Sequence, residues 1–371
     1  MLAAGIVFAD LHHKHLEELT AKRTVASIPF GGRYRLIDFA LSNLVNANIT
    51  KVGIVTKQNY QSLMDHIGSG KDWDLSRRNG GAYIFPPFGH YRSEILYENR
   101  LEALQSIMNF IDKCQEENLV LMDCDSVNVI DYADVLKEHI ANNADITMVY
   151  RHAEVLPDME GYMTLELDEN KRVRSATITS EVGSIKDTTI NVWVIKRKLL
   201  STLMADAKAK GATSLRKDII LPNLKNLRIF GYLHNGLHLH IDSLEGYFEK
   251  NMLLLKEDVR HAIFENPDLP IYTKVRDSAP TKYGSEAVVE NSYIADGCII
   301  EGKVINSILF RGVKIGKNTV VENAILMQDT MVENDVNLNY IITDKNVTIR
   351  SRQTLSGCKK IPYYIGKNIM V

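Results

Sequence analysis

The chain has 371 residues, 45% of them hydrophobic, and a formal net charge of −2 with acidic and basic residues interspersed. This length favours two domains, and the mixed charge argues against a nucleic-acid-binding face. No apolar run approaches the ~18 residues of a membrane span, and the N-terminus has no signal-peptide pattern. Four scattered cysteines predict reduced thiols, so the expected location is the cytoplasm.

Short apolar segments alternate with helical patterns from residue 1 to about residue 260. The sequence predicts strands at 1–7, 51–55, 119–122 and 146–150, and helices at 38–47, 101–114 and 132–142. Strands separated by amphipathic helices predict an α/β domain over 1–260, built on a mostly parallel sheet. Sheets of this kind bind ligands at the carboxyl ends of their strands.

The texture of the sequence changes in its last third. Residues 261–282 contain three prolines and are expected to form a linker. Beyond it, over 283–371, aliphatic residues recur at intervals close to six, with glycine, asparagine and aspartate between them. They are Ile294, Ile300, Ile305, Leu309, Ile315, Val321, Leu326, Val332 and Leu338. A period of six is typical of hexapeptide repeats and predicts a parallel β-helix.

Two long motifs carry a resemblance to a known family. Residues 28–43 read IPFGGRYRLIDFALSN and residues 73–88 read WDLSRRNGGAYIFPPF. With GYFEKNM at 246–252, they closely resemble the glucose-1-phosphate adenylyltransferase (ADP-glucose pyrophosphorylase) family. The resemblance implies a Rossmann-like, GT-A-like nucleotidyltransferase domain followed by a left-handed β-helix. It also implies synthesis of ADP-glucose from ATP and glucose 1-phosphate with Mg²⁺, by tetramers that phosphorylated metabolites control.

The positions that the family uses to hold ATP differ in this chain. Residues 8–15, after the first strand, contain no glycine and include Asp10, whose charge opposes a triphosphate. His15 stands where the family has an arginine, and Val25 stands where it has a lysine. Arg100 falls in the turn beside the adenine pocket, where the base needs room. These departures predict a degenerate substrate site.

The metal ligands implied by the resemblance are also incomplete. Asp125 retains the first aspartate, but His240 takes the place of the second, and imidazole is a poor ligand for a hard cation. Asp125 is therefore expected to be a vestigial ligand. No cofactor is expected to be required here, with Mg²⁺ acting only at a catalytic partner.

This pattern of loss resembles the GlgD-type regulatory subunits of the family, which assemble with catalytic GlgC-type subunits into heterotetramers. We therefore expect no catalytic residues, a catalytic partner subunit, and a phosphate or phosphorylated-metabolite effector. Basic residues near the intact motif and in the last β-helix coils are the candidates for an effector-anion site. They are Lys22, Arg23, Arg35, Lys345, Arg350 and Arg352.

Other functions remain open at this point. An active nucleotidyltransferase with a rebuilt phosphate loop would need other groups to hold the triphosphate. Hexapeptide β-helices also occur in acyltransferases, but that chemistry usually needs a histidine base and none follows His261. A pure assembly scaffold without effector binding is the fourth possibility.

Overall fold

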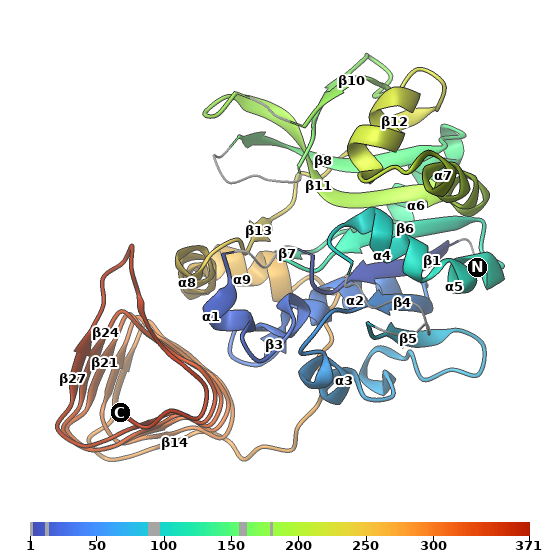
Figure 1. Ribbon diagram of the computed structural model, residues 1–371. Coiled ribbons are helices and arrows are strands. Elements are labelled where there is room, and N and C mark those ends of the chain that lie inside the picture. The colour runs from blue at the N-terminus through green and yellow to red at the C-terminus, as the bar shows by residue number, and fades with distance from the viewer. Residues whose placement is uncertain (1–2, 12–14, 88–96, 156–161, 179–180) are drawn as a thin grey trace.

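A computed structural model describes residues 3–11, 15–87, 97–155, 162–178 and 181–371. The chain forms an α/β domain followed by a prism of short strands with a triangular cross-section (Figure 1). Among the described residues, no helix combines the length and apolar character needed to cross a membrane.

Nine of the described strands form one mixed sheet in the first domain. Its main path runs β10 (Val173–Thr177), β9 (Thr164–Leu167), β11 (Ile185–Lys196), β6 (Asn118–Asp123), β1 (Ala3–Phe8), β4 (Lys51–Val55) and β5 (Gly81–Phe85). β8 (Ile146–Glu154) pairs with β11 and with β12 (Ile229–Leu233). The predicted parallel pairing holds for β6, β1, β4 and β5. β11 instead runs antiparallel to both β6 and β8.

Some of the helices begin at a residue whose side chain accepts a hydrogen bond from a free amide of the first turn. The helices of the domain are α1 (Glu17–Thr20), α2 (Leu36–Asn46), α3 (Gln61–Ile67), α4 (Arg100–Ser106), α5 (Met108–Lys113), α6 (Tyr132–Ala141), α7 (Arg197–Lys210), α8 (Leu244–Met252) and α9 (Glu257–Phe264). Asn99 accepts from the Glu102 amide at 3.1 Å, and Ser243 accepts from the Gly246 amide at 2.9 Å. Such caps typically contribute about 1 kcal/mol each.

A small two-stranded sheet lies next to the carboxyl end of β6. β7 (Ser126–Asn128) pairs antiparallel with β13 (His238–His240), and His240 lies opposite Ser126. This pairing brings His240 next to Asp125, which precedes β7. Residues far apart in sequence therefore meet at the sheet edge where α/β proteins bind ligands.

The second domain is a left-handed parallel β-helix. Within the continuously described segment 181–371, its strands stack into three five-stranded parallel sheets. The first sheet contains β14 (Lys282–Tyr283), β17 (Ile299–Ile300), β20 (Lys314–Ile315), β23 (Met331–Val332) and β26 (Thr348–Ile349). The second contains β15 (Val288–Glu290), β18 (Lys303–Ile305), β21 (Val320–Glu322), β24 (Asn337–Asn339) and β27 (Thr354–Ser356). The third contains β16 (Tyr293–Ile294), β19 (Ile308–Leu309), β22 (Ile325–Leu326), β25 (Ile341–Thr343) and β28 (Tyr363–Ile365).

The six-residue period identified most of the inward-facing positions. Ile300, Ile315 and Val332 stack in the buried interior, as predicted. One position was wrong: Val304 is fully buried, whereas Ile305 is only partly buried. Adjacent side chains on a strand point to opposite faces, so a shift of one residue exchanges inside for outside.

One cluster of buried apolar side chains contains residues of both domains. Ile308, Phe310 and Ile325 on one β-helix face cluster with buried residues of the α/β domain, including Phe30 and Phe39. α8 and α9 lie on the side of the sheet that faces the β-helix (Figure 1). The domains therefore pack as a unit, and side chains from both can build one site.

The connecting segment differs slightly from the expected linker. α9 runs to Phe264, so the expected boundary at 260 falls inside a helix. Val259 and Ile263 are buried on one face of α9, and this packing favours continuation of the helix until Pro267 approaches. The first β-helix strand, β14, begins at Lys282, within the predicted linker.

Candidate functional site

A hydrogen bond links the segment after β1 to the backbone of Val25. Asp10 is 8% exposed, and its Oδ1 accepts a hydrogen bond from the Val25 amide at 3.2 Å. Val25 is fully buried in a short 3₁₀ helix (Val25–Ser27). A buried apolar side chain thus stands where the resemblance implies a lysine, while His15 is exposed to solvent. Residues 12–14 of the loop lie outside the described residues.

Arg100 lies buried at the carboxyl end of the central strands, where sheets of this kind have their ligand crevice. It is 5% exposed, and its guanidinium lies 5.4 Å from the Phe8 ring centre and 5.2 Å from that of Trp193. Its Nε donates to Asp123 Oδ1 at 3.0 Å, and its Nη2 donates to the Asn191 carbonyl at 2.6 Å. Arg100 is thus buried, stacked and charge-paired at the position that the resemblance assigns to the turn beside the adenine pocket.

His240 lies between two carboxylates. Its Nε2 is 3.4 Å from Asp125 Oδ2, and its Nδ1 is 3.8 Å from Asp242 Oδ2. The Tyr162 ring meets the imidazole edge-to-face at 5.3 Å between ring centres. Burial is the largest influence and opposes the charged imidazole, but the charge and hydrogen bond of Asp125, together with Asp242 and Asp123, outweigh it, so the pKa of His240 is raised above its ordinary value.

This donor set does not fit the Mg²⁺ ion that the resemblance implies. An imidazole next to Asp125 replaces the oxygen ligand that a hard cation prefers, and it supplies positive charge of its own. Among the described residues, no group of three or more histidine, cysteine or acidic side chains could hold a metal ion. We derive no step through a metal at this site.

Sequence reasoning missed the second arginine of the crevice. Arg216 donates to Asn191 Oδ1 at 3.1 Å, and burial, with Arg100 nearby, lowers its pKa to about 10. Asn191 lies where β11 shifts register and has a φ of 62°. No local sequence signal marks this contact, because it depends on a β-bulge that a short apolar run does not reveal.

A second candidate site lies between the domains. A small pocket, with a cavity volume of about 30 Å³, is lined by Pro29, Gly32, Arg33, Tyr34, Arg35, His66, Lys274, Arg276, Phe310, Arg311, Gln328 and Lys345. Six of these described lining residues are lysine or arginine, and none is acidic. Arg33 and Arg311 share Asp296, each at 3.3 Å. The other four have no carboxylate within ion-pair distance among the described residues. The pocket therefore has excess positive charge.

Burial, together with neighbouring cations, lowers the pKa values of Arg35 and Lys345 in this pocket. Burial lowers the pKa of Arg35 to about 10, and its Nη1 donates to the Ser62 carbonyl at 2.6 Å. Burial, followed by the charges of Arg35 and Arg23, lowers the pKa of Lys345 to about 6. An anion bound in the pocket would reduce the repulsion among these cations and would supply the counter-charge that they lack.

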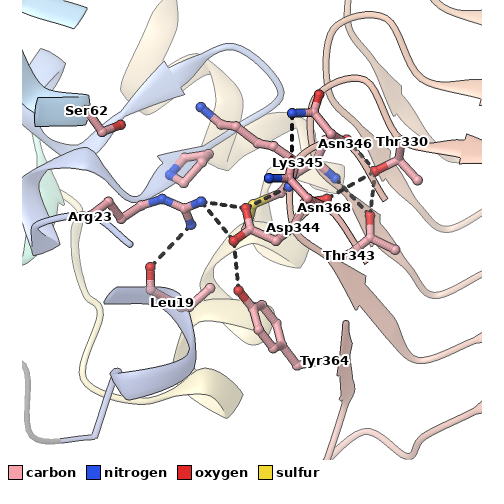
Figure 2. A network of polar contacts seen from close by, with 12 residues as sticks. Leu19, Arg23, Ser62, Thr330, Thr343, Asp344, Lys345, Asn346, Tyr364 and Asn368 are labelled. Atoms are coloured by element: carbon pink, nitrogen blue, oxygen red, sulfur yellow. Dashed lines mark hydrogen bonds and ion pairs between the residues drawn. The ribbon is translucent and has the colours of Figure 1, made fainter. Parts of the chain in front are cut away.

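Arg23 is part of the domain interface. Its Nη2 lies 2.5 Å and 2.8 Å from the two carboxylate oxygens of Asp344, and both side chains are almost fully buried. Tyr364 donates to the same carboxylate at 2.9 Å. Figure 2 shows this network, with Arg23 reaching from the α/β domain to the β-helix. Arg23 is therefore an interdomain ion-pair residue, not an anion ligand free in the pocket as the sequence suggested.

The structure brings only part of the predicted effector group together. Arg35 and Lys345 line the same pocket, and Arg23 lies next to it. Lys22, Arg350 and Arg352 are exposed and do not line the pocket. Sequence reasoning missed Arg33, although it lies in the intact motif. It also missed the pocket residues Lys274, Arg276 and Arg311, which lie in the linker and in a β-helix turn.

Comparisons with known proteins agree with the two-domain architecture. Residues 9–177 match the family model for nucleotidyl transferase, and residues 278–357 match the GlmU-like, C-terminal hexapeptide model. The glycogen biosynthesis protein GlgD of Bacillus subtilis (strain 168) is 32% identical over 366 residues, 99% of this chain and 96% of that protein. The chain belongs to the GlgD group of the glucose-1-phosphate adenylyltransferase family.

Other relatives agree with this GlgD assignment. The glycogen biosynthesis protein GlgD of Geobacillus stearothermophilus is 37% identical over 85% of this chain and 82% of that protein. A glucose-1-phosphate adenylyltransferase of Clostridium perfringens (strain 13 / Type A) is 27% identical over 96% of this chain and 97% of that protein. The chain thus matches these relatives over almost their whole length.

Proposed function

We propose that this chain is a non-catalytic or very weakly active regulatory subunit of an ADP-glucose pyrophosphorylase. That enzyme makes ADP-glucose and diphosphate from ATP and glucose 1-phosphate during glycogen-type glucan synthesis. The chain acts in the cytoplasm with a catalytic GlgC-type subunit in a heterotetramer, and Mg²⁺ acts at the partner. The observation that carries the proposal is Arg100, buried and paired with Asp123 in the crevice where a nucleotide would bind.

The pocket between the domains supports the regulatory half of the proposal. Six lysine and arginine side chains without an acidic lining residue suit a phosphate or a phosphorylated metabolite. The lining comes from both domains, so a bound anion contacts the α/β core and the β-helix at once. An effector held there can favour one arrangement of the domains and transmit that preference to a neighbouring subunit.

The far end of the β-helix supports assembly. Ile361, Tyr363, Ile369 and Met370 are large apolar side chains, each about half exposed or more. They lie at or near the last coil, where a stack of parallel strands presents unpaired edges. We assign this end to a contact with a partner subunit.

The effector response tests the pocket. In a complex reconstituted with a catalytic GlgC-type subunit, Arg276→Gln combined with Lys345→Gln is expected to shift the half-effective concentration of inorganic phosphate or a sugar bisphosphate by roughly 5–150-fold. The measurement is the rate of ADP-glucose formation at increasing effector concentration. Lys22→Gln combined with Arg350→Gln replaces one lysine and one arginine outside the pocket and is the matched control. Equal effector curves for both double variants in intact complexes would contradict the assignment.

A further inference from the structure

Lys345 lacks a counter-charge although an aspartate precedes it in sequence. The Asp344 carboxylate is already occupied by Arg23, by the Tyr364 hydroxyl and by the Lys345 backbone amide at 2.7 Å. No ion pair joins the Lys345 ammonium to a carboxylate among the described residues. Its side chain extends from the β-helix toward the α/β domain, over the Arg23–Asp344 pair (Figure 2). The amine therefore enters the pocket without a charge partner.

The surroundings of Lys345 are predominantly basic on every side. The charged and titratable groups of the neighbouring elements are Arg23, Arg35, Asp38, His66, Lys274, Arg276, Arg311 and Asp344. The acidic members are committed elsewhere: Asp38 contacts His66 Nε2 at 2.6 Å and the Thr273 hydroxyl, while Asp344 holds Arg23. A charged Lys345 is therefore disfavoured in the empty pocket by burial and by Arg35, Arg23 and Arg276, which the Asp344 carboxylate offsets only in part.

We propose that anion binding in this pocket is coupled to protonation of Lys345. In the free chain at neutral pH the amine is uncharged, which limits repulsion among the clustered cations. A bound dianion supplies the missing negative charge, and Lys345 Nζ takes up one proton from solvent as the anion enters. No covalent bond forms or breaks. The inference rests on the effector pocket of the proposed function and specifies how pH regulates it.

The sign of the pH effect follows from proton uptake. The lowered pKa of Lys345, about 6, arises mainly from burial and then from Arg35 and Arg23. A bound anion raises that pKa. The affinity for the anion is therefore greatest below about pH 6, and it falls as pH rises from the pKa of Lys345 in the free chain to its pKa in the anion-bound chain. With one proton taken up per anion, the loss of affinity is at most about tenfold per pH unit. Effector control would thus be stronger in more acidic conditions.

Sulfate binding to the full-length chain tests the coupling. Sulfate is a suitable probe because it stays a dianion across this range, so only protein groups titrate. Isothermal titration calorimetry at constant ionic strength, from pH 5.5 to pH 8, is expected to show a dissociation constant that rises by several-fold to about tenfold per pH unit above pH 6. At pH 7, heats measured in buffers of different ionisation enthalpy should give an uptake close to one proton.

Three variants assign the proton to one residue. Lys345→Arg keeps the positive charge and is expected to bind sulfate without pH dependence over this range, since arginine does not titrate there. Lys345→Gln should bind more weakly at pH 6 and also lose the pH dependence. His66→Gln keeps a hydrogen-bond donor toward Asp38 and should retain the slope, because burial lowers the pKa of His66 and so disfavours its protonation.

The possible outcomes separate this inference from the proposed function. Sulfate binding with an equal affinity from pH 6 to pH 8, or a slope that persists in Lys345→Arg, would overturn the coupling and leave the anion pocket intact. Loss of the slope in His66→Gln alone would assign the proton to the histidine and also overturn it. Absence of sulfate binding at every pH would overturn both the coupling and the effector pocket.

Discussion

Arg23→Met is expected to destabilise the folded chain by about 3–5 kcal/mol, because it leaves the Asp344 carboxylate buried with only its neutral partners. The Arg23–Asp344 ion pair joins the α/β domain to the β-helix. We therefore expect the loss of stability to separate the two domains before either unfolds. Urea unfolding followed by tryptophan fluorescence and by circular dichroism measures it. Both tryptophans, Trp73 and Trp193, are buried in the α/β domain, whereas circular dichroism reports on both domains.

A double-variant cycle separates the ion pair from general packing. Arg23→Met leaves the Asp344 carboxylate without its ion-pair partner, and Asp344→Asn removes that charge. The destabilisation of the double variant should therefore be smaller than the sum of the two single destabilisations by at least about 1 kcal/mol. Arg350→Met, an exposed arginine on the β-helix, is the control and should change stability by less than about 0.5 kcal/mol. A loss below about 1 kcal/mol for Arg23→Met would show that the pair does not hold the interface.

His240→Asp is expected not to restore ADP-glucose synthesis, although it returns a carboxylate to the metal position implied by the family. Arg100 still fills the crevice, and Asp10 still binds the Val25 amide where a phosphate would need room. Each missing preorganised group typically costs 10²–10³ in rate, so one substitution leaves a deficit of several orders of magnitude. The assay is steady-state turnover with ATP, glucose 1-phosphate and Mg²⁺.

Two comparisons make this result interpretable. The catalytic GlgC-type subunit provides the positive control, and Arg100→Ala combined with His240→Asp tests whether emptying the crevice changes nucleotide binding. Turnover near the usual ~1–10³ s⁻¹ for His240→Asp alone would contradict the importance assigned to Arg100 and Asp10.

The β-helix was the most predictable part of the fold. A period of six is visible in a single sequence because each coil repeats the same inward position. The prediction failed at Ile305, where Val304 is the buried residue, because two adjacent aliphatic side chains offer the same signal. The direction of β11 was not predictable either. A short apolar run shows that a strand is buried and carries no information about whether it runs parallel or antiparallel to its neighbours.

The sites were less predictable because they depend on distant pairing. Arg23 and Asp344 are 321 positions apart, so nothing local marks the arginine as an ion-pair residue. Arg100 was recognised as an intrusion into the nucleotide region, but its stacking on Phe8 and Trp193 became visible only in the folded chain. Lys274 and Arg276 join the pocket because the linker passes over the domain interface, a path that sequence does not determine.

The most direct test of the regulatory role is the rate of ADP-glucose formation by three samples: this chain alone, a catalytic GlgC-type subunit alone, and the co-purified complex, each with and without phosphate or a sugar bisphosphate. We expect this chain alone to turn over substrate not at all or far below an ordinary enzymatic rate, and the effector response of the complex to differ from that of the catalytic subunit by roughly 5–150-fold. Turnover by this chain alone at an ordinary enzymatic rate, or a complex with the effector response of the catalytic subunit alone, would contradict the regulatory role.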